Sequence, residues 1–236
     1  MVTRVRTCGR AGSAVLIQSE WTSETIRLLV MQAWTFITAF GDSAVLMPCA
    51  IAIFFWLGLA REAWSLAWLW LLLFGAMAAL VVASKLMFMA WGLGIPLLNF
   101  TGISGHSAMS AVVWPALLAL LWPTSRGDSR VAGAAVGLLF ALTIAVSRVA
   151  VHAHSWTEIL AGFSLGGGAV SAFLWKIGPG WHWKGSRWPA VLTLLFMLAI
   201  TYGHRFPSER VLRFVAQHLS LESTVHTRRS LHESNE

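Results

Sequence analysis

Charged residues are scarce in this sequence. They make up 11% of its 236 residues, whereas hydrophobic residues make up 57%. Soluble domains carry roughly 25% charged residues, so this composition argues against a water-soluble globular domain. We expect an integral membrane protein whose apolar runs cross the bilayer as helices. The length suits one compact bundle and leaves no room for a second sizeable domain.

Cysteine pairs, a secretion signal and a nucleic-acid-binding motif are also missing. Of the two cysteines, Cys49 lies in an apolar run, so we expect neither a disulfide with Cys8 nor a thiolate metal site. Residues 1–20 hold only a weak apolar stretch, and we expect no cleavable signal peptide. The net charge of +7 comes from basic tails and short connections, which indicate membrane topology and contact with anionic lipids rather than nucleic-acid binding.

Six uncharged apolar runs are candidates for crossing helices, because about 20 residues span ~30 Å of hydrocarbon. They are residues 43–60, 63–84, 107–122, 131–146, 159–175 and 188–202. Residues 28–41 are interpreted as an interfacial helix, with a seventh crossing as the alternative. The predicted fold class is therefore all-α, an integral membrane helical bundle of about six transmembrane helices with an interfacial N-terminal helix.

This pattern divides the chain into three parts. Residues 1–42 are the N-terminal tail and interfacial helix, 43–204 the transmembrane bundle and 205–236 a polar C-terminal tail. Within the tail, 207–219 could form a short amphipathic helix and 220–236 is predicted to be disordered. Two GxxxG pairs inside predicted spans, Gly133 with Gly137 and Gly162 with Gly166, indicate close helix packing, and Asp42 is a candidate helix cap.

Polar and ionisable groups next to membrane spans are costly and call for an explanation. Four such groups lie at ends of the predicted spans: Lys85, Ser104-Gly105-His106, Ser147-Arg148, and His154 with Glu158. In a six-span topology, the connections 85–106 and 147–158 fall on the same side of the membrane. We therefore expect the four groups to meet at one membrane face.

The chemistry of this set suits a phosphate group. Lys85 and Arg148 supply positive charge and Ser104 a hydroxyl donor, while N–H groups at a helix N-terminus attract an anion. His154 and Glu158 are four residues apart, which on a helix places them on one face. A carboxylate bound to one ring nitrogen leaves the other nitrogen free as a nucleophile, and His106 is then available as the acid for a leaving oxygen. Such a set needs no metal or other cofactor.

These residues resemble the type 2 phosphatidic acid phosphatases, also called lipid phosphate phosphatases. The family signature is a lysine, six residues and arginine-proline; then proline-serine-glycine-histidine; then serine-arginine, five residues, histidine, three residues and aspartate. This sequence supplies Lys85, residues 103–106, and Ser147-Arg148 followed at that spacing by His154 and Glu158. It departs from the signature at Gly92 (arginine), Ile103 (proline) and Glu158 (aspartate). The phosphate contact missing at Gly92 is either lost or supplied elsewhere, for example by Arg61 or a tail arginine.

The resemblance implies a role for each matched residue. His154 looks like the nucleophile that forms a phosphoenzyme, Glu158 holds its ring, and His106 is the acid for the leaving group. The remaining matched residues would hold the phosphate oxygens: Lys85, Ser104, Gly105, Ser147 and Arg148. The implied activity is metal-independent hydrolysis of a phosphomonoester or diphosphate on a lipid. Phosphatidic acid, phosphatidylglycerol phosphate, an isoprenyl phosphate or diphosphate, and a lipid A phosphate all stay open as substrates.

Other interpretations stay open at this point. A non-catalytic lipid-binding or transport protein with a degenerate pocket is the main alternative, whereas the related vanadium-dependent haloperoxidases are soluble. His152 is expected to line the pocket or the interface, and Asn99 and Thr101 lie in a connection that leads to the pocket. Basic residues in short connections predominate on the face opposite the pocket, which predicts a bacterial inner-membrane protein whose active site faces the periplasm.

Overall fold

The described residues of the computed structural model are 10–59, 63–122, 129–178, 188–204, 206–220 and 225–228, and they are almost entirely helical. The helices are α1 (Arg10–Ala39), α2 (Ser43–Gly58), α3 (Trp64–Trp91), the 3-10 turn η1 (Pro96–Leu98), α4 (Gly105–Leu121), α5 (Ser129–Ala150), α6 (Trp156–Ile177), α7 (Trp188–Thr201) and α8 (Ser208–Leu219). Within these ranges the only β-type pairing is an isolated bridge between Ile95 and Phe100. The predicted all-α class is confirmed.

Each of the six predicted spans corresponds to one helix, from α2 to α7. Four stretches are long and apolar enough to cross a membrane: Glu24–Gly58, Trp64–Trp91, Arg130–Ala150 and Trp156–Ile177. α4 and α7 are apolar but shorter, with 17 and 14 residues. At 1.5 Å per residue, α4 is about 25 Å long and falls at the short end of the range for a crossing helix. The molecule is a membrane helical bundle.

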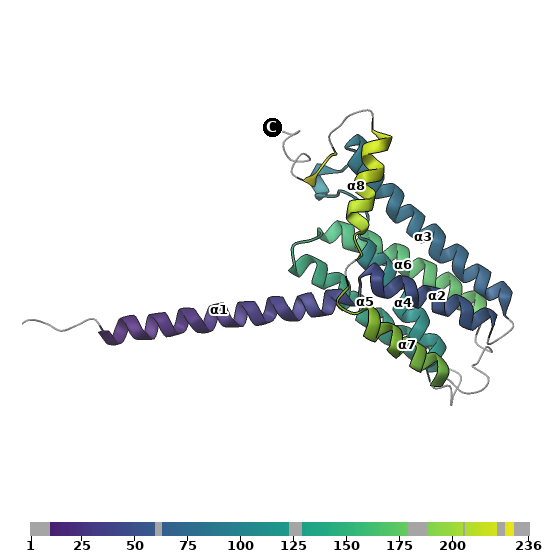
Figure 1. Cartoon of the computed structure of the whole chain (residues 1–236), viewed down its shortest axis with the longest axis horizontal. Helices are drawn as coiled ribbons and strands as arrows, with labels where there is room; N and C mark the ends of the chain where they lie inside the picture. The colour runs from purple at the N-terminus through teal and green to yellow at the C-terminus, as the bar shows by residue number, and fades with distance from the viewer. Residues whose placement is uncertain are drawn as a thin grey trace, which may run out of the picture.

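The N-terminal helix is much longer than the interfacial segment that the sequence predicted. α1 has 30 residues, and Figure 1 shows it projecting away from the bundle. Its C-terminal end packs against α5. A tight turn then leads into α2, whose N-cap is Asp42; the carboxylate accepts a hydrogen bond of 2.8 Å from Ala44 N–H, as an N-cap should.

The prediction that Lys85 ends the second span is wrong. α3 continues to Trp91, so Lys85 lies about two turns before the end of this helix. The apolar pattern resumes after Lys85, and exposed side chains such as Met87 and Trp91 face away from the bundle. A single lysine interrupts the apolar run in the sequence, but its long side chain lets the helix continue past it.

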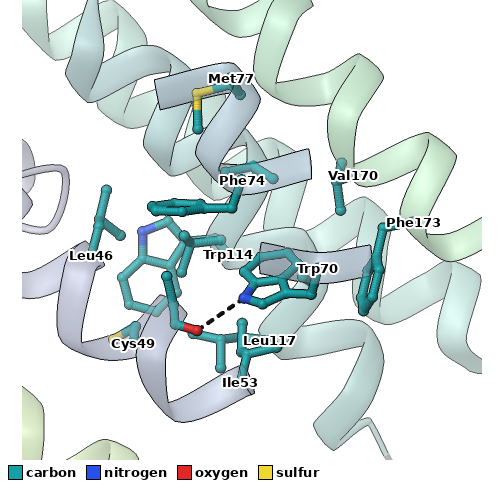
Figure 2. Packing of buried hydrophobic residues seen from close by; sticks show 14 of the residues in the cluster. Leu46, Cys49, Ile53, Trp70, Phe74, Met77, Trp114, Leu117, Val170 and Phe173 are labelled. Carbon is teal, nitrogen blue, oxygen red and sulfur yellow. Dashed lines mark hydrogen bonds between the residues drawn. The ribbon is translucent and has the colours of Figure 1, made fainter. Parts of the chain in front are cut away.

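The core is organised around α4, which is buried along almost its whole length. α5 and α6 pack along it, and α2 and α3 complete the cluster. Figure 2 shows this core, in which Trp70 of α3 lies among residues of α2, α4 and α6. The indole N–H of Trp70 donates to the carbonyl of Ala50 at 2.9 Å, so the largest buried side chain leaves no unsatisfied donor.

Glycines allow α5 and α6 to approach α4 closely, as the two GxxxG pairs predicted. At each of four glycines a Cβ would lie no more than 2.5 Å from an atom of α4 or its N-cap. Gly133 and Gly137 of α5 face Leu118 and Pro115, whereas Gly162 and Gly166 of α6 face Ser104 and Ala108. Because these neighbours are backbone atoms, they cannot give way as a side chain would.

Gly166→Ala should destabilise the bundle, because the added methyl group would overlap the carbonyl oxygen of Ala108. We expect a loss of about 1–3 kcal/mol, the usual cost of overpacking, seen as a lower Tm in detergent. Gly168→Ala is the matched control, since a Cβ there meets open space on the same helix. The control should be unchanged or slightly more stable, because alanine favours helices over glycine. Equal Tm values for the two variants would contradict the close packing.

The polar C-terminal part contains the predicted amphipathic helix. α8 packs against α3, and Figure 1 shows it crossing the end of that helix. Arg213 and Glu209 pair on its exposed side at 3.2 Å. Of residues 220–236, which the sequence predicted to be disordered, Ser220 and 225–228 are described, and the remainder lies outside the described residues.

Candidate active site

The end of α3, the start of α4, the end of α5 and the start of α6 meet at one end of the bundle. Ser104 N–H donates to the main-chain carbonyl of Glu158 at 3.1 Å, which joins the start of α4 to the start of α6. Ile103 N–H donates to Ser84 Oγ at 3.0 Å, which fixes the same loop to α3. The structure therefore brings together the four segments that carry the predicted polar residues.

The carboxylate of Glu158 lies at the centre of this meeting point and is completely buried. Its Oε1 accepts hydrogen bonds from Thr101 N–H at 2.8 Å and from the Thr101 hydroxyl at 2.6 Å. Its Oε2 lies 3.1 Å from Ser155 N, 2.7 Å from His154 Nδ1 and 2.6 Å from Arg228 Nη2. A buried anion is tolerated when donors compensate its lost hydration, and this one has five.

His154 meets Glu158 as predicted, but for a different reason. The ring does not lie on the same helix face, because His154 precedes Ser155, the N-cap of α6. Ser155 and Glu158 form a capping box, in which each side chain accepts from the other residue's N–H. Glutamate is the residue that such a box prefers at this position, so the longer side chain in place of the family's aspartate serves both the helix start and the ring of His154.

The protonation of His154 follows from its surroundings. An ionised carboxylate can only accept, so Nδ1 carries the proton toward Glu158 and Nε2 keeps its lone pair. Burial lowers the pKa of His154 below its ordinary value of 6.5, and the positive charges of Lys85 and Arg148 act in the same direction. The hydrogen bond to Glu158 opposes them without cancelling them. The ring is neutral at neutral pH.

Ser104, Gly105 and His106 form the predicted N-terminus of α4. Ser104 is the N-cap, and its Oγ accepts a hydrogen bond of 3.0 Å from the hydroxyl of Ser107. A hydroxyl that accepts in this way keeps its own proton for donation. His106 Nε2 lies 3.8 Å from Asp42 Oδ2, so the cap of α2 places a negative charge beside this imidazole. The sequence did not link these two residues.

Ser147 and Arg148 lie in the last turn of α5, as predicted. The hydroxyl of Ser147 is buried and donates to the carbonyl of Ile144 at 2.6 Å, so its proton is used within the helix. Arg148 Nη1 donates to the hydroxyl of Thr38 at 3.0 Å, which links the end of α5 to α1. Lys85 interacts electrostatically with Glu209 of α8 as well as with Arg148 and Glu158, so its ammonium group lies between the start of α8 and this cluster.

A pocket of about 710 Å³ opens beside this cluster and is lined by His106 and Arg148. The rest of its wall comes from the end of α1, the N-cap of α2 (Asp42), the turn after α5, the α7–α8 connection and the start of α8. His152 is not among the lining residues: its side chain is exposed, and its backbone adopts φ +55° in the turn after α5. Of the two expected positions for His152, the pocket wall is contradicted, and the interface stays a prediction.

Sequence reasoning missed three of the four residues that donate to Glu158, namely Thr101, Ser155 and Arg228. Thr101 was expected near the substrate, but it binds the carboxylate that holds His154. Nothing in the sequence around Arg228 points to the site. It is one of the tail arginines that the sequence offers as a source of the missing cation. Arg61, the other source, lies outside the described residues.

Comparison with known proteins places the chain among phosphatases. Residues 94–183 match the PAP2 superfamily, and this range contains the second and third parts of the signature. The chain belongs to the PAP2 superfamily, which supports a phosphatase at the family level. It is 40% identical over 203 residues to an uncharacterized 22.5 kDa protein in the cps region of Klebsiella pneumoniae, covering 84% of this chain and 97% of that protein. No solved structure matches the chain.

Thr101→Val should destabilise the site while keeping the side-chain shape. The change removes the hydroxyl that donates to Glu158 at 2.6 Å, and hydrogen bonds to charged groups contribute about 1.5–3 kcal/mol. Chemical denaturation in detergent measures the loss. Thr143→Val is the control, because that hydroxyl is exposed and bonds only to its own helix carbonyl at Leu139. An equal, small effect at both positions would show that Thr101 does not hold the carboxylate.

Proposed function

We propose that this protein hydrolyses a phosphomonoester or diphosphate on a lipid through a phosphohistidine intermediate. The observation that carries the proposal is the 2.7 Å contact between His154 Nδ1 and a fully buried Glu158, in a cluster with Lys85 and Arg148. This arrangement leaves Nε2 of His154 free, fixes the orientation of the ring and places positive charges beside it. Membership of the PAP2 superfamily supports the same chemistry.

In the first step, Nε2 of His154 attacks phosphorus and the bond from phosphorus to the leaving oxygen breaks. His106 gives its proton to that oxygen, and its Nε2 lies 3.8 Å from Asp42 Oδ2. Lys85, Arg148, the Ser104 hydroxyl and the N–H groups of α4 at Gly105 and His106 stabilise the negative charge on the phosphoryl oxygens. Ser147 can donate to a phosphate oxygen only after its hydroxyl breaks its hydrogen bond to the carbonyl of Ile144.

In the second step, water attacks the phosphoenzyme. His106, now neutral, accepts a proton from the water, the bond between phosphorus and Nε2 breaks, and inorganic phosphate leaves. Throughout, Glu158 accepts from Nδ1 and stabilises positive charge on the ring of His154. Both steps balance with water as the sole co-reactant.

A lipid substrate is supported by the surroundings of the site. α3 carries Lys85 on its inner side, while Leu80 and Met87 of the same helix are exposed apolar residues. Leu160, just after Glu158, is likewise exposed on α6. Apolar side chains exposed on membrane helices face acyl chains. A phosphate on a lipid would therefore reach the cluster from the bilayer, with the 710 Å³ pocket accommodating the polar part.

The same proposal includes a location in the bacterial inner membrane with the site facing the periplasm. Arg130 lies at the start of α5 and Arg148 near its end, and Lys176 lies at the end of α6, so Arg130 and Lys176 lie at the end of the bundle opposite the site. Arg130 contacts the carbonyl of Gly178 at that end. Basic residues in short connections stay in the cytoplasm, which leaves the site outside.

The purified protein should release inorganic phosphate from a panel of lipid phosphates in the presence of EDTA, and vanadate should block the release. His154→Ala should lose more activity than the ~10²–10³-fold that removal of one oxyanion donor costs, because it deletes the covalent step. Rapid acid-free quenching with a ³²P-labelled substrate should trap label on wild type and not on this variant. His218→Ala, an exposed histidine of α8, is the matched control.

Equal, slow phosphate release by wild type and His154→Ala would contradict catalysis. Retained binding of labelled lipid phosphate in both would then favour the non-catalytic lipid-binding or transport protein.

The acidic limb of the kcat/KM profile should lie below pH 6.5. The pKa of His154 is lowered by burial, so the reactive neutral ring persists as the pH falls past the ordinary histidine value. Because the substrate phosphate also titrates, inactivation by diethyl pyrocarbonate with vanadate protection should give the same pKa without substrate. Glu158→Gln should move this limb to still lower pH, since the lost hydrogen bond had raised the pKa. A limb at or above pH 6.5 would be inconsistent with a buried His154.

A further inference from the structure

The chain after α8 returns to the active site. His226 N–H donates to the carbonyl of Met89 in the last turn of α3 at 3.0 Å, so residues 225–228 lie along the end of that helix. Two residues further on, the guanidinium of Arg228 reaches Glu158 at 2.6 Å and the hydroxyl of Thr101 at 3.5 Å. We call residues 225–228 the returning segment.

The returning segment packs against Gly92, where the absence of a side chain leaves room for it. Gly92 is the C-cap of α3 with φ +68°, a left-handed conformation that favours glycine. A Cβ at Gly92 would lie 3.1 Å from Cε1 and 3.2 Å from Nδ1 of His226, so the absent side chain leaves space for this ring. Gly92 is also the position at which the signature of the family has an arginine. The missing cation and the space for the returning segment therefore occur at the same residue.

Arg228 contacts a group that has no access to solvent. The Glu158 side chain is 0% exposed and the Arg228 side chain is 36% exposed, so the cation approaches a buried anion from the outer side of the site. Both Arg228 Nη2 and His154 Nδ1 lie within hydrogen-bonding distance of the same oxygen, Glu158 Oε2. Arg228 thus acts on the nucleophile through the carboxylate that orients it.

We propose that Arg228 is a positioning residue for the reaction at His154, supplied by the returning segment and anchored by His226 over Gly92. Arg228 fixes the position of the Glu158 carboxylate, so that Nε2 of His154 stays directed at phosphorus. The returning segment thereby supplies a cation to the site from a part of the chain where the signature has none. This inference rests on the proposed phosphatase function.

Arg228→Gln should lower kcat by about 10–100-fold, the usual effect of removing a partner that orients a functional side chain, with KM changed little. Arg228→Lys should recover part of the loss, because it keeps a cation within reach of Glu158. Arg213→Gln, which removes an exposed arginine of α8, is the matched control and should behave as wild type. Tm values measured in parallel show whether each variant is folded.

The acidic limb of the kcat/KM profile separates positioning from mere structural support. The charged groups around His154 are Lys85 on α3, Arg148 on α5 and Glu158 on α6, and Arg228 shares the oxygen of Glu158. Removing Arg228 takes away a positive charge and leaves Glu158 Oε2 with His154 Nδ1 and Ser155 N–H as its partners. Arg228→Gln should therefore shift the limb to higher pH, whereas Arg228→Lys should leave it near the wild-type position.

Gly92→Ala tests the anchor without touching Arg228. Its methyl group would lie 3.1 Å from the His226 ring, in a left-handed backbone conformation that alanine rarely adopts, so the returning segment should shift and kcat should fall toward that of Arg228→Gln. The double variant should be no worse than either single variant, because both remove the same contact.

The outcomes separate the two proposals. If wild type releases phosphate faster than His154→Ala but Arg228→Gln matches wild type in kcat and pH profile, the role of Arg228 is overturned and the phosphatase stands. If Arg228→Gln is faster than wild type, the returning segment inhibits the site and the positioning role is likewise overturned. If wild type and His154→Ala release phosphate equally slowly, the proposed function itself fails.

Discussion

A carboxylate with no access to water determines how this end of the molecule is built. Glu158 is held by donors from the α3–α4 loop, the α5–α6 turn and the chain after α8. An isolated buried anion is unfavourable by several kcal/mol. If one of these segments moved away, the carboxylate would lose a donor that compensates for its burial. The same contacts orient His154. The arrangement of the site and the stability of its surroundings therefore depend on one side chain.

The close approach of α6 to α4 makes this network possible. Gly162 faces the carbonyl of Ser104, and Ser104 N–H in turn binds the carbonyl of Glu158. A larger residue at 162 would separate the two helix starts, and with them the hydroxyl of Ser104 and the carboxylate. The small residues thus act at a distance from the chemistry: they set the spacing between the two helix N-termini that flank the site.

Local patterns predicted much of this structure, and long-range contacts account for what they missed. The apolar runs predicted α2 to α7, and Asp42 and Ser104 predicted two helix starts, because these signals depend on neighbouring residues. The end of α3 was missed, since Lys85 interrupts hydrophobicity but not helical backbone. The return of Arg228 could not be read from its surroundings, because a polar tail looks the same whether it is solvated or bound to a site 70 residues away in sequence. The residue roles at the site stay predictions.

The late position of Arg228 in the chain has a consequence for biosynthesis. Every helix from α1 to α8 precedes it, so the last donor to Glu158 is synthesised after all of these helices. During synthesis the carboxylate has only its partners from the α3–α4 loop and the α5–α6 turn. The order of translation thus makes Arg228 the last of the donors to Glu158 to join the site.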